Sequence, residues 1–391
     1  MSADVAQRPT SQASDEPPAE QAARQRQWPT MGAAPALVWL GARGFGLLAW
    51  WAMTPPDRAL RLDVWDARWY LLIAQRGYWG ADLAAPSDHH TITAAFGFFP
   101  GFPLLVEGLT PMCLGHPLVA AELVVGVSGV VFAYGLRRLA ERVTASRQVG
   151  LVAVLLVAAA PMSVVFSLPY AEALFAALAV WALVMLLDER WLAAGTLTLL
   201  AGLVRPDGAA LVAVVVVVAL ARSWRTGAFE PLFGAILAPL GIGGWWAVSS
   251  SMMGDPTGYL AAQQAEWHTH LDGGVTTVQS MWIVVTREQT VWPVLCVAAS
   301  IGGVVAACLA ARRLPTPAWF YGLLVMVLAL GTAGIFYAKP RELLAAFVLA
   351  IPAAAWATRQ SCPVVATVLG GWVLLGTWSS AYALTVWHMA V

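Results

Sequence analysis

The sequence predicts an all-α fold, a polytopic bundle of membrane-spanning helices. Hydrophobic residues make up 59% of its 391 residues and charged residues only 11%, against roughly 25% charged in a soluble globular domain. Apolar runs recur from residue 34 onward at about the 20-residue length that a helix needs to cross the hydrocarbon core. Runs such as residues 211–220 (LVAVVVVVAL) are continuously apolar, whereas the strands of a membrane β-barrel alternate in polarity. The composition therefore excludes a soluble fold, and the pattern excludes a barrel.

The chain divides into a tail and a membrane domain. Residues 1–33 are rich in Ala, Gln, Pro and Ser and lack an apolar run, which predicts a disordered cytoplasmic tail. Residues 34–391 are predicted to form one transmembrane domain, with its first span at about 34–53. This span lacks the position and short core of a cleavable signal, so we expect it to be retained.

Arginine clusters predict the orientation. Short connections around 137–147, 222–225 and 312–313 carry paired or clustered arginines, and such loops are typically cytoplasmic. We therefore expect a multi-pass protein of the cell membrane whose larger polar segments, about 54–95 and 252–290, form loops on the extracytoplasmic side.

The stretch 96–113 affects the predicted number of spans. If it crossed the membrane fully, the arginines at 137–147 would lie outside. Its prolines instead indicate a short, re-entrant or interfacial segment, which gives about eleven spans. No sequence repeat indicates the inverted halves of a transporter.

Charge and cysteine content exclude other classes. The 22 basic and 22 acidic residues balance, which gives no sign of a nucleic-acid partner. The four cysteines are scattered, and no Cys/His spacing indicates a metal site. We expect no cofactor and no metal. The triplet Asp88-His89-His90 is more simply a solvated loop than a ligand set.

Asp66 is the first candidate catalytic residue. The segment from Asp66 to Tyr78 has Trp69, Leu72 and Ile73 at helical spacing, which predicts an amphipathic interfacial helix in the first outer loop, with Asp66 near its start. The carboxylate can cap that helix, or it can take a proton from a hydroxyl at the water–membrane boundary.

Three later segments place charged side chains at predicted membrane boundaries. They hold Tyr170 with Glu172, Arg205 with Asp207, and Lys339 with Arg341 and Glu342. Each charge can be a snorkelling or paired interfacial residue. Together they favour a site for an anionic headgroup, because arginine presents a planar fork to phosphate and lysine a point charge.

Two further features concern ligands and partners. The turn signal Gly254-Asp255-Pro256 precedes a predicted short helix with Gln263 and Trp267, side chains that can grip sugar hydroxyls and faces. Arg43 lies inside the first span and needs a partner. Glu107 and Glu122 are the candidates for that partner.

With these segments in view, the chain resembles the PIG-V-type mannosyltransferases, the family of the second mannosyltransferase of glycosylphosphatidylinositol assembly, over most of residues 36–350. The motifs that carry the resemblance are Trp65-Asp66 with Ile73-Ala74 and Gly77-Tyr78, Phe98-Phe99-Pro100 with Pro103-Leu104, Ser167 with Tyr170, Glu172 and Leu174-Phe175, Arg205-Pro206 with Gly208, Gly254-Asp255-Pro256 with Gln263 and Trp267, and Arg341-Glu342.

The resemblance implies a GT-C type glycosyltransferase. Such an enzyme transfers mannose, with inversion, from polyprenyl-phosphate-mannose to a hydroxyl of a lipid, glycan or protein on the outer face. Asp66 matches the essential aspartate of the first outer loop. Ala171 and Asp207 depart from the family pattern, which puts the choice of substrate in doubt.

The resemblance implies a role for each candidate site residue. We expect Asp66 to be the general base, and the cations Arg205, Arg341 and Lys339 to bind the donor phosphate. The remaining candidates are expected to orient the sugar or the acceptor: Trp65, Tyr170, Glu172, Gln263 and Trp267. A flippase or transporter of lipid-linked sugars, or an inactive scaffold, would share the composition. A transporter would place its charges in mid-span with access from both faces.

Overall fold

The computed structural model of the protein describes residues 32–84, 93–287 and 290–387. Within this part of the chain the regular elements are helices, and a single antiparallel bridge joins Leu271 to Thr332. The predicted all-α fold is therefore confirmed. The Asp88-His89-His90 triplet lies outside the described residues.

Seven segments are long and apolar enough to cross a membrane. They are α2 (Ala34–Met53), α5 (Pro117–Thr144), α9 (Gly208–Thr226), Glu230–Met253 with α10 (Glu230–Leu237) and α11 (Leu240–Met253), α14 (Val291–Ala310), Phe336–Ala357 with α16 (Lys339–Glu342) and α17 (Ala350–Ala357), and α18 (Cys362–Thr385). Four shorter apolar helices accompany them, namely α6 (Arg147–Ala158), α7 (Glu172–Leu187), α8 (Trp191–Gly202) and α15 (Thr316–Gly331). The predicted number of about eleven crossing segments stays a prediction.

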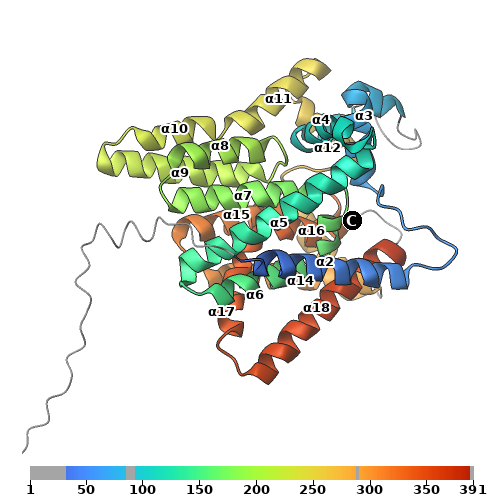
Figure 1. Ribbon diagram of the computed structural model, residues 1–391. Helices are drawn as coiled ribbons and strands as arrows, with labels where there is room; N and C mark the ends of the chain where they lie inside the picture. The colour runs from blue at the N-terminus through green and yellow to red at the C-terminus, as the bar shows by residue number, and fades with distance from the viewer. Residues whose placement is uncertain (1–31, 85–92, 288–289, 388–391) are drawn as a thin grey trace, which may run out of the picture. The chain divides into compact units, whose positions relative to one another are not determined.

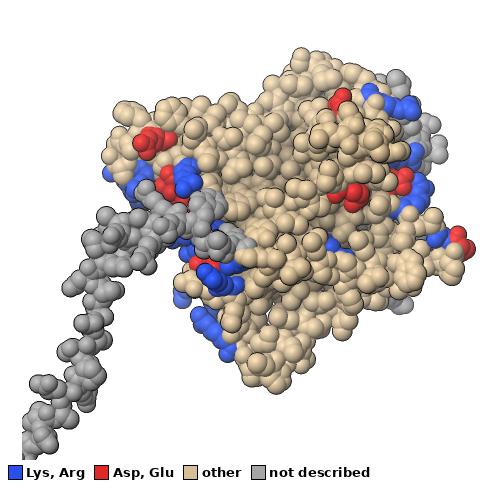
Figure 2. Space-filling model, viewed as in Figure 1, with Lys and Arg blue, Asp and Glu red and all other residues tan. Residues whose placement is uncertain are grey.

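The surface of these helices is that of a membrane protein. Many large apolar side chains on them are exposed, among them Leu40, Val217, Val304 and Leu374. In a protein dissolved in water such a surface would be an aggregation hazard. On the face drawn in Figure 2, most of the Lys, Arg, Asp and Glu side chains gather toward two opposite ends of the view, with uncharged surface between them. The protein is a multi-pass membrane protein.

Helix α7 lies at the centre of the packing. Its sequence EALFAALAVWALVMLL is apolar on all sides, and it is buried along most of its length, as expected for a helix without a polar face. It packs against both α5 and α8 (Figure 1). Because neighbouring helices hold it on several sides, its first residue, Glu172, has a well-defined position.

The polar segment after the first span folds as predicted into a helix that begins at Asp66. This helix, α3 (Asp66–Ala84), is kinked at Gly77, whose φ of 68° lies in the left-handed region that favours glycine. The stretch 96–113 contains only one α-helix, α4 (Gly101–Leu109), between the 3₁₀ turns η1 (Ala94–Gly97) and η2 (Thr110–Cys113). The helix and η2 follow one another without a break, and the stretch is not among the candidate spans of the described residues. Its predicted re-entrant or interfacial placement stays a prediction.

The second large polar segment also forms helices. A turn at Gly254, with φ of 66°, precedes α12 (Gly258–Trp267), and α13 (Val275–Arg287) follows. The predicted turn and short helix are therefore confirmed. The remaining 3₁₀ turns are η3 (Ser163–Ser167), η4 (Phe336–Ala338) and η5 (Leu343–Leu349).

The predicted partners of Arg43 are wrong. Its guanidinium donates to the backbone oxygens of Ser163 and Ala158 and, over 2.8 Å, to the hydroxyl of Ser163. The carbonyl of Ala158 at the end of α6 and the carbonyl of Ser163 in the 3₁₀ turn that follows thus bind Arg43 in place of Glu107 and Glu122. The chain after α6 places these carbonyl oxygens next to the first span.

Close helix packing depends on a few glycines, which gives a first testable prediction. A β-carbon on Gly195 of α8 would lie 2.7 Å from the Cα of Gly234 on α10, a contact with backbone that no side-chain rotation relieves. We expect Gly195→Ala to destabilise the protein by about 1–3 kcal/mol. Gly126→Ala is the matched control, since its β-carbon would meet nothing within 4 Å. Thermal unfolding of both variants in the same detergent measures the difference, and equal melting temperatures would contradict the packing described here.

Candidate active site

Four separate parts of the chain bring charged side chains to one place. Asp66 is the first residue of α3 and Glu172 the first residue of α7. Arg205 and Asp207 lie in the connection between α8 and α9, and Arg341 lies in α16. We call these five residues the Arg–carboxylate cluster.

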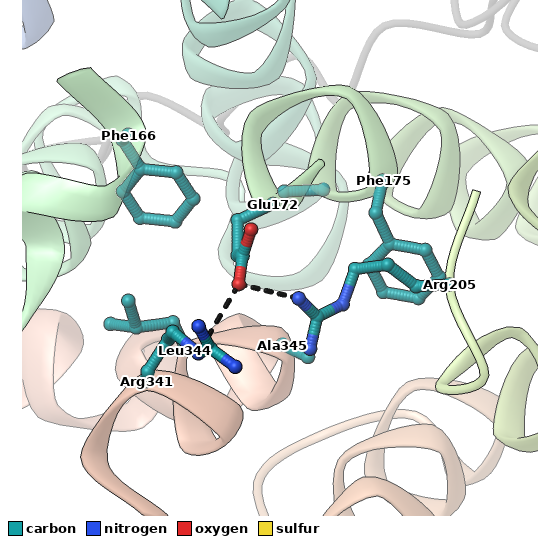
Figure 3. Close-up of a pocket in the computed structure, with 8 residues that line it drawn as sticks. Phe166, Glu172, Phe175, Arg205, Arg341, Leu344 and Ala345 are labelled. Atoms are coloured by element: carbon teal, nitrogen blue, oxygen red, sulfur yellow. Dashed lines mark ion pairs between the residues drawn. The ribbon is translucent and has the colours of Figure 1, made fainter. Parts of the chain in front are cut away.

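Glu172 joins the two arginines of the cluster. Its Oε1 lies 2.5 Å from Nη1 of Arg205 and 3.5 Å from Nε of Arg341. Figure 3 shows the Glu172 carboxylate between the two guanidinium groups, one from each side of the pocket. A single buried carboxylate therefore holds two cations near each other.

Each arginine also binds a second carboxylate. Arg341 Nη1 lies 2.6 Å from Oδ2 of Asp66, although the two residues are 275 positions apart in the chain. Arg205 Nε donates to Oδ2 of Asp207 over 2.7 Å. The cluster thus alternates in charge from Asp66 to Asp207, and its three carboxylates exceed its two guanidiniums by one negative charge.

Burial differs along this row of charges. Glu172 is 5% exposed, and Arg205 and Asp207 are equally well buried. The side chain of Asp66 retains 25% exposure. Buried charges of this kind persist only where they are paired, and in the cluster Asp66 is the carboxylate most accessible to a ligand from outside.

A small pocket adjoins the cluster. Glu172, Arg205 and Arg341 form its charged wall (Figure 3). The other lining residues are apolar: Phe166, Phe175, Ala176, Leu344 and Ala345. Apolar walls exclude water and so strengthen the electrostatic interactions made by the two arginines.

Tyr170 and Trp65 lie at the Asp66 end of the cluster. The phenol oxygen of Tyr170 accepts a hydrogen bond from the backbone N–H of Asp66 over 3.3 Å. Its ring lies 5.5 Å from the guanidinium carbon of Arg341, within cation–π range. Trp65 adopts a φ of 49°, a left-handed conformation that is uncommon for a bulky residue and is found at functional sites. Both predicted substrate residues thus contact or precede Asp66 directly.

Tyr70 is a neighbour of the site that sequence reasoning missed. Burial raises the pKa of the Tyr70 phenol, and the negative charge of Glu172 raises it further. The signal was present in the sequence, because Tyr70 follows Asp66 by four residues, one helical turn, and so shares its helix face. Asp207, two residues after Arg205, was named with it in the sequence but was given no role in the expected reaction.

Lys339 lies apart from the cluster. It is 2% exposed, and its Nζ donates to the backbone oxygen of Thr332 and to Oε2 of Glu342, each over 3.1 Å. Its ammonium group is therefore occupied by partners next to the cluster rather than within it, and its predicted role in phosphate binding stays a prediction.

Gln263 and Trp267 lie on α12, against η1. Gln263 Nε2 donates to the backbone oxygen of Gly97 over 2.8 Å, and the Trp267 ring meets Phe98 edge to face with centroids 5.5 Å apart. Phe98 also packs on Tyr70, at a centroid distance of 5.1 Å. The side-chain contacts described for Gln263 and Trp267 are thus with Gly97 and Phe98 and not with the cluster.

In the part of the chain that the structure describes, no three His, Cys, Asp or Glu side chains are grouped so that they could hold a metal ion.

Comparison with known proteins identifies the fold. No family model matches the chain, and no curated protein matches its sequence. The structure is similar to the crystal structure of ArnT from Cupriavidus metallidurans bound to undecaprenyl phosphate, with a TM-score of 0.56 and 16% sequence identity. The match covers 88% of this chain and 64% of the ArnT chain. The predicted polytopic helical fold is confirmed, and it is similar to the fold of ArnT. The narrower resemblance to the PIG-V-type enzymes stays a prediction.

The position of Glu172 between Arg205 and Arg341 leads to a second testable prediction. Glu172→Gln removes the carboxylate between two buried guanidiniums, and breaking a buried ion pair in this way costs about 3 kcal/mol or more. Glu189→Gln is the control, because Glu189 forms an exposed pair with Arg222 at 3.0 Å and such pairs contribute less than about 1 kcal/mol. We expect thermal unfolding to separate the two variants clearly. Similar melting temperatures would show that Glu172 does not hold the arginines together.

Proposed function

We propose that the protein is a membrane glycosyltransferase that transfers a sugar from a polyprenyl-phosphate donor to a hydroxyl group. The observation that carries the proposal is the Arg–carboxylate cluster, in which a partly exposed aspartate and two arginines meet beside a pocket. The similarity in fold to ArnT, a protein crystallised with undecaprenyl phosphate, supports a polyprenyl-phosphate donor. Mannose as the sugar and reaction on the extracytoplasmic face follow from the resemblance to the PIG-V-type enzymes and from the arginine pattern of the loops.

The proposed reaction is a direct displacement at the anomeric carbon. The oxygen of the acceptor hydroxyl forms a bond to that carbon, and the hydroxyl proton passes to the carboxylate of Asp66. The bond between the anomeric carbon and the phosphate oxygen breaks, and its electron pair stays with the phosphate. Because attack and departure occur on opposite faces, the configuration is inverted. The phosphate leaves as an anion, so the step needs no general acid.

Arg341 connects the base to the leaving group in this scheme. In the structure its Nη1 binds Asp66 while its Nε faces Glu172. A donor phosphate that approaches Arg341 and Arg205 competes with Asp66 for the same guanidinium, since arginine binds phosphate as well as carboxylate through its planar fork. Binding of the donor then frees the Asp66 carboxylate to accept a proton. The arginines also stabilise the charge that develops on the departing phosphate.

The other predicted site residues have positioning roles. Tyr170 orients Asp66 through its backbone N–H and Arg341 through its ring. Trp267 and Gln263 contact Phe98 and Gly97, and their proposed role is to orient the sugar or the acceptor.

The proposal predicts that Asp66→Asn abolishes transfer. Removal of a general base costs about 10²–10⁴-fold in rate, so we expect at least a hundredfold loss of radiolabelled mannose transferred from polyprenyl-phosphate-mannose in membranes with matched expression. Asp63→Asn is the control, because Asp63 lies in the same segment, is exposed and pairs only with Arg61 among the contacts described for it. It is expected to retain wild-type transfer.

The outcomes separate the parts of the proposal. A labelled product formed by wild type and Asp63→Asn but not by Asp66→Asn supports the base and identifies the acceptor. Equal product from Asp66→Asn and wild type would remove Asp66 as the base. If wild-type membranes transfer no label from polyprenyl-phosphate-mannose or from another polyprenyl-linked hexose donor, the proposed activity is wrong.

A further inference from the structure

A second, small pocket lies between α2, η3 and α18 and belongs to none of the groups described above. Its lining residues are Arg43, Gly46, Leu47, Ser163, Val164, Ser167, Thr377 and Ser380. Five of these eight residues carry polar side chains, although the pocket lies among helices that are long and apolar enough to span a membrane. We call it the Arg43 pocket.

The charge of Arg43 has no acidic partner. Arg43 is 8% exposed, and no carboxylate of the described residues lies within ion-pair distance of it. Its bonds go to the backbone oxygens of Ala158 and Ser163 and to the Ser163 hydroxyl, and its guanidinium carbon lies 5.7 Å from the Trp39 ring. Its Nε has no hydrogen-bond partner among the described residues.

These contacts compensate the charge only in part. Ala158 is the last residue of α6, and the carbonyls at a helix C-terminus carry about half a negative charge in total. A cation inside a membrane bundle is otherwise paired with a full negative charge. By contrast, Arg205 and Arg341 each contact two carboxylates. Arg43 therefore retains positive charge that the protein does not balance.

The rest of the pocket supplies hydrogen-bond donors. Ser380 is 4% exposed, and its Oγ has no partner among the described residues. Thr377 is buried one helical turn earlier on α18 and lines the same pocket. A buried cation, an unpartnered N–H and unpartnered hydroxyl together form an environment that selects an anion with several oxygens.

The pocket also reaches the lipid side of the bundle. Leu47 on its rim is 39% exposed, and α2 packs directly against α18, so the pocket lies at a seam between two candidate spans. The headgroup of a membrane lipid can reach the pocket along such a seam.

We propose that the Arg43 pocket binds the phosphate group of a membrane lipid. The bound phosphate balances Arg43 and receives hydrogen bonds from Nε and from the Ser380 hydroxyl. η3 separates this site from the catalytic pocket: Ser163 and Ser167 face the Arg43 pocket, while Phe166 of the same turn lines the catalytic pocket. A lipid bound here stabilises η3 and, through the short connection that follows it, the position of Glu172. This inference does not depend on the proposed transferase activity.

Native mass spectrometry of the purified protein tests the site with two probes, phosphatidylglycerol and a short-chain polyprenyl phosphate, and with diacylglycerol as the phosphate-free reference. Gly46→Leu places a larger side chain at the lining of the pocket, where a β-carbon on Gly46 meets nothing within 4 Å. Gly41→Leu is the matched control on the same helix, since its β-carbon is equally free but does not line the pocket. Arg43→Gln removes the charge.

We expect Gly46→Leu and Arg43→Gln to weaken phospholipid binding about tenfold or more, as for loss of a charged hydrogen bond, while Gly41→Leu binds as wild type does. Measurements with polyprenyl phosphate are repeated in a background that carries both Arg205→Gln and Arg341→Gln, which removes the two cations proposed to bind the donor phosphate. Weakening for both lipids identifies a general phosphate site, and weakening for polyprenyl phosphate alone identifies a site for that lipid.

Unchanged binding of both lipids in Gly46→Leu, or binding of diacylglycerol as tight as that of the anionic lipids, would overturn the proposal. Because the readout is binding, the result is independent of whether the protein transfers sugar.

Discussion

The contact of the Glu172 carboxylate with two guanidinium groups is the interaction on which the rest of the site depends. Arg205 comes from the α8–α9 connection and Arg341 from α16, so one buried side chain joins three parts of the chain. Two guanidiniums would otherwise repel each other strongly in a medium of low dielectric constant. Through Arg341 the same interaction reaches Asp66 and fixes the start of α3. The site is therefore a single electrostatic unit and not a set of independent residues.

The fold holds this unit in place by helix packing. Glu172 is rigid because α7, apolar on all sides, is enclosed by α5 and α8. Asp66 is less buried because it begins a helix outside the candidate spans. Glu172 is thus a fixed, buried carboxylate and Asp66 an accessible one, and Arg341 lies between them. In our proposal this difference in burial lets an incoming phosphate release Asp66 without disturbing the pairing of Glu172.

Much of this arrangement could be predicted from the sequence. Composition and apolar runs predicted the helical membrane fold, and the helical spacing after Asp66 predicted where α3 begins. The high cost of placing charge in a membrane indicated that Glu172, Arg205 and Arg341 belong to a site, and the structure places them in contact. The partners of Arg43 and Lys339 could not be predicted, because they include backbone carbonyls of Ala158, Ser163 and Thr332, which leave no trace in a side-chain pattern. The position of Gln263 and Trp267 depends on how α12 packs on η1, a tertiary contact that local spacing does not encode.

The central claim is that donor phosphate replaces Asp66 as a partner of Arg341. It is tested most directly by an experimental structure of the wild-type protein with bound polyprenyl phosphate. Our account predicts phosphate density within hydrogen-bond distance of Arg205 and Arg341, and a distance from Arg341 to Asp66 longer than the present 2.6 Å, with Glu172 unmoved. A phosphate bound away from both arginines, with the ion pair between Asp66 and Arg341 intact, would contradict it.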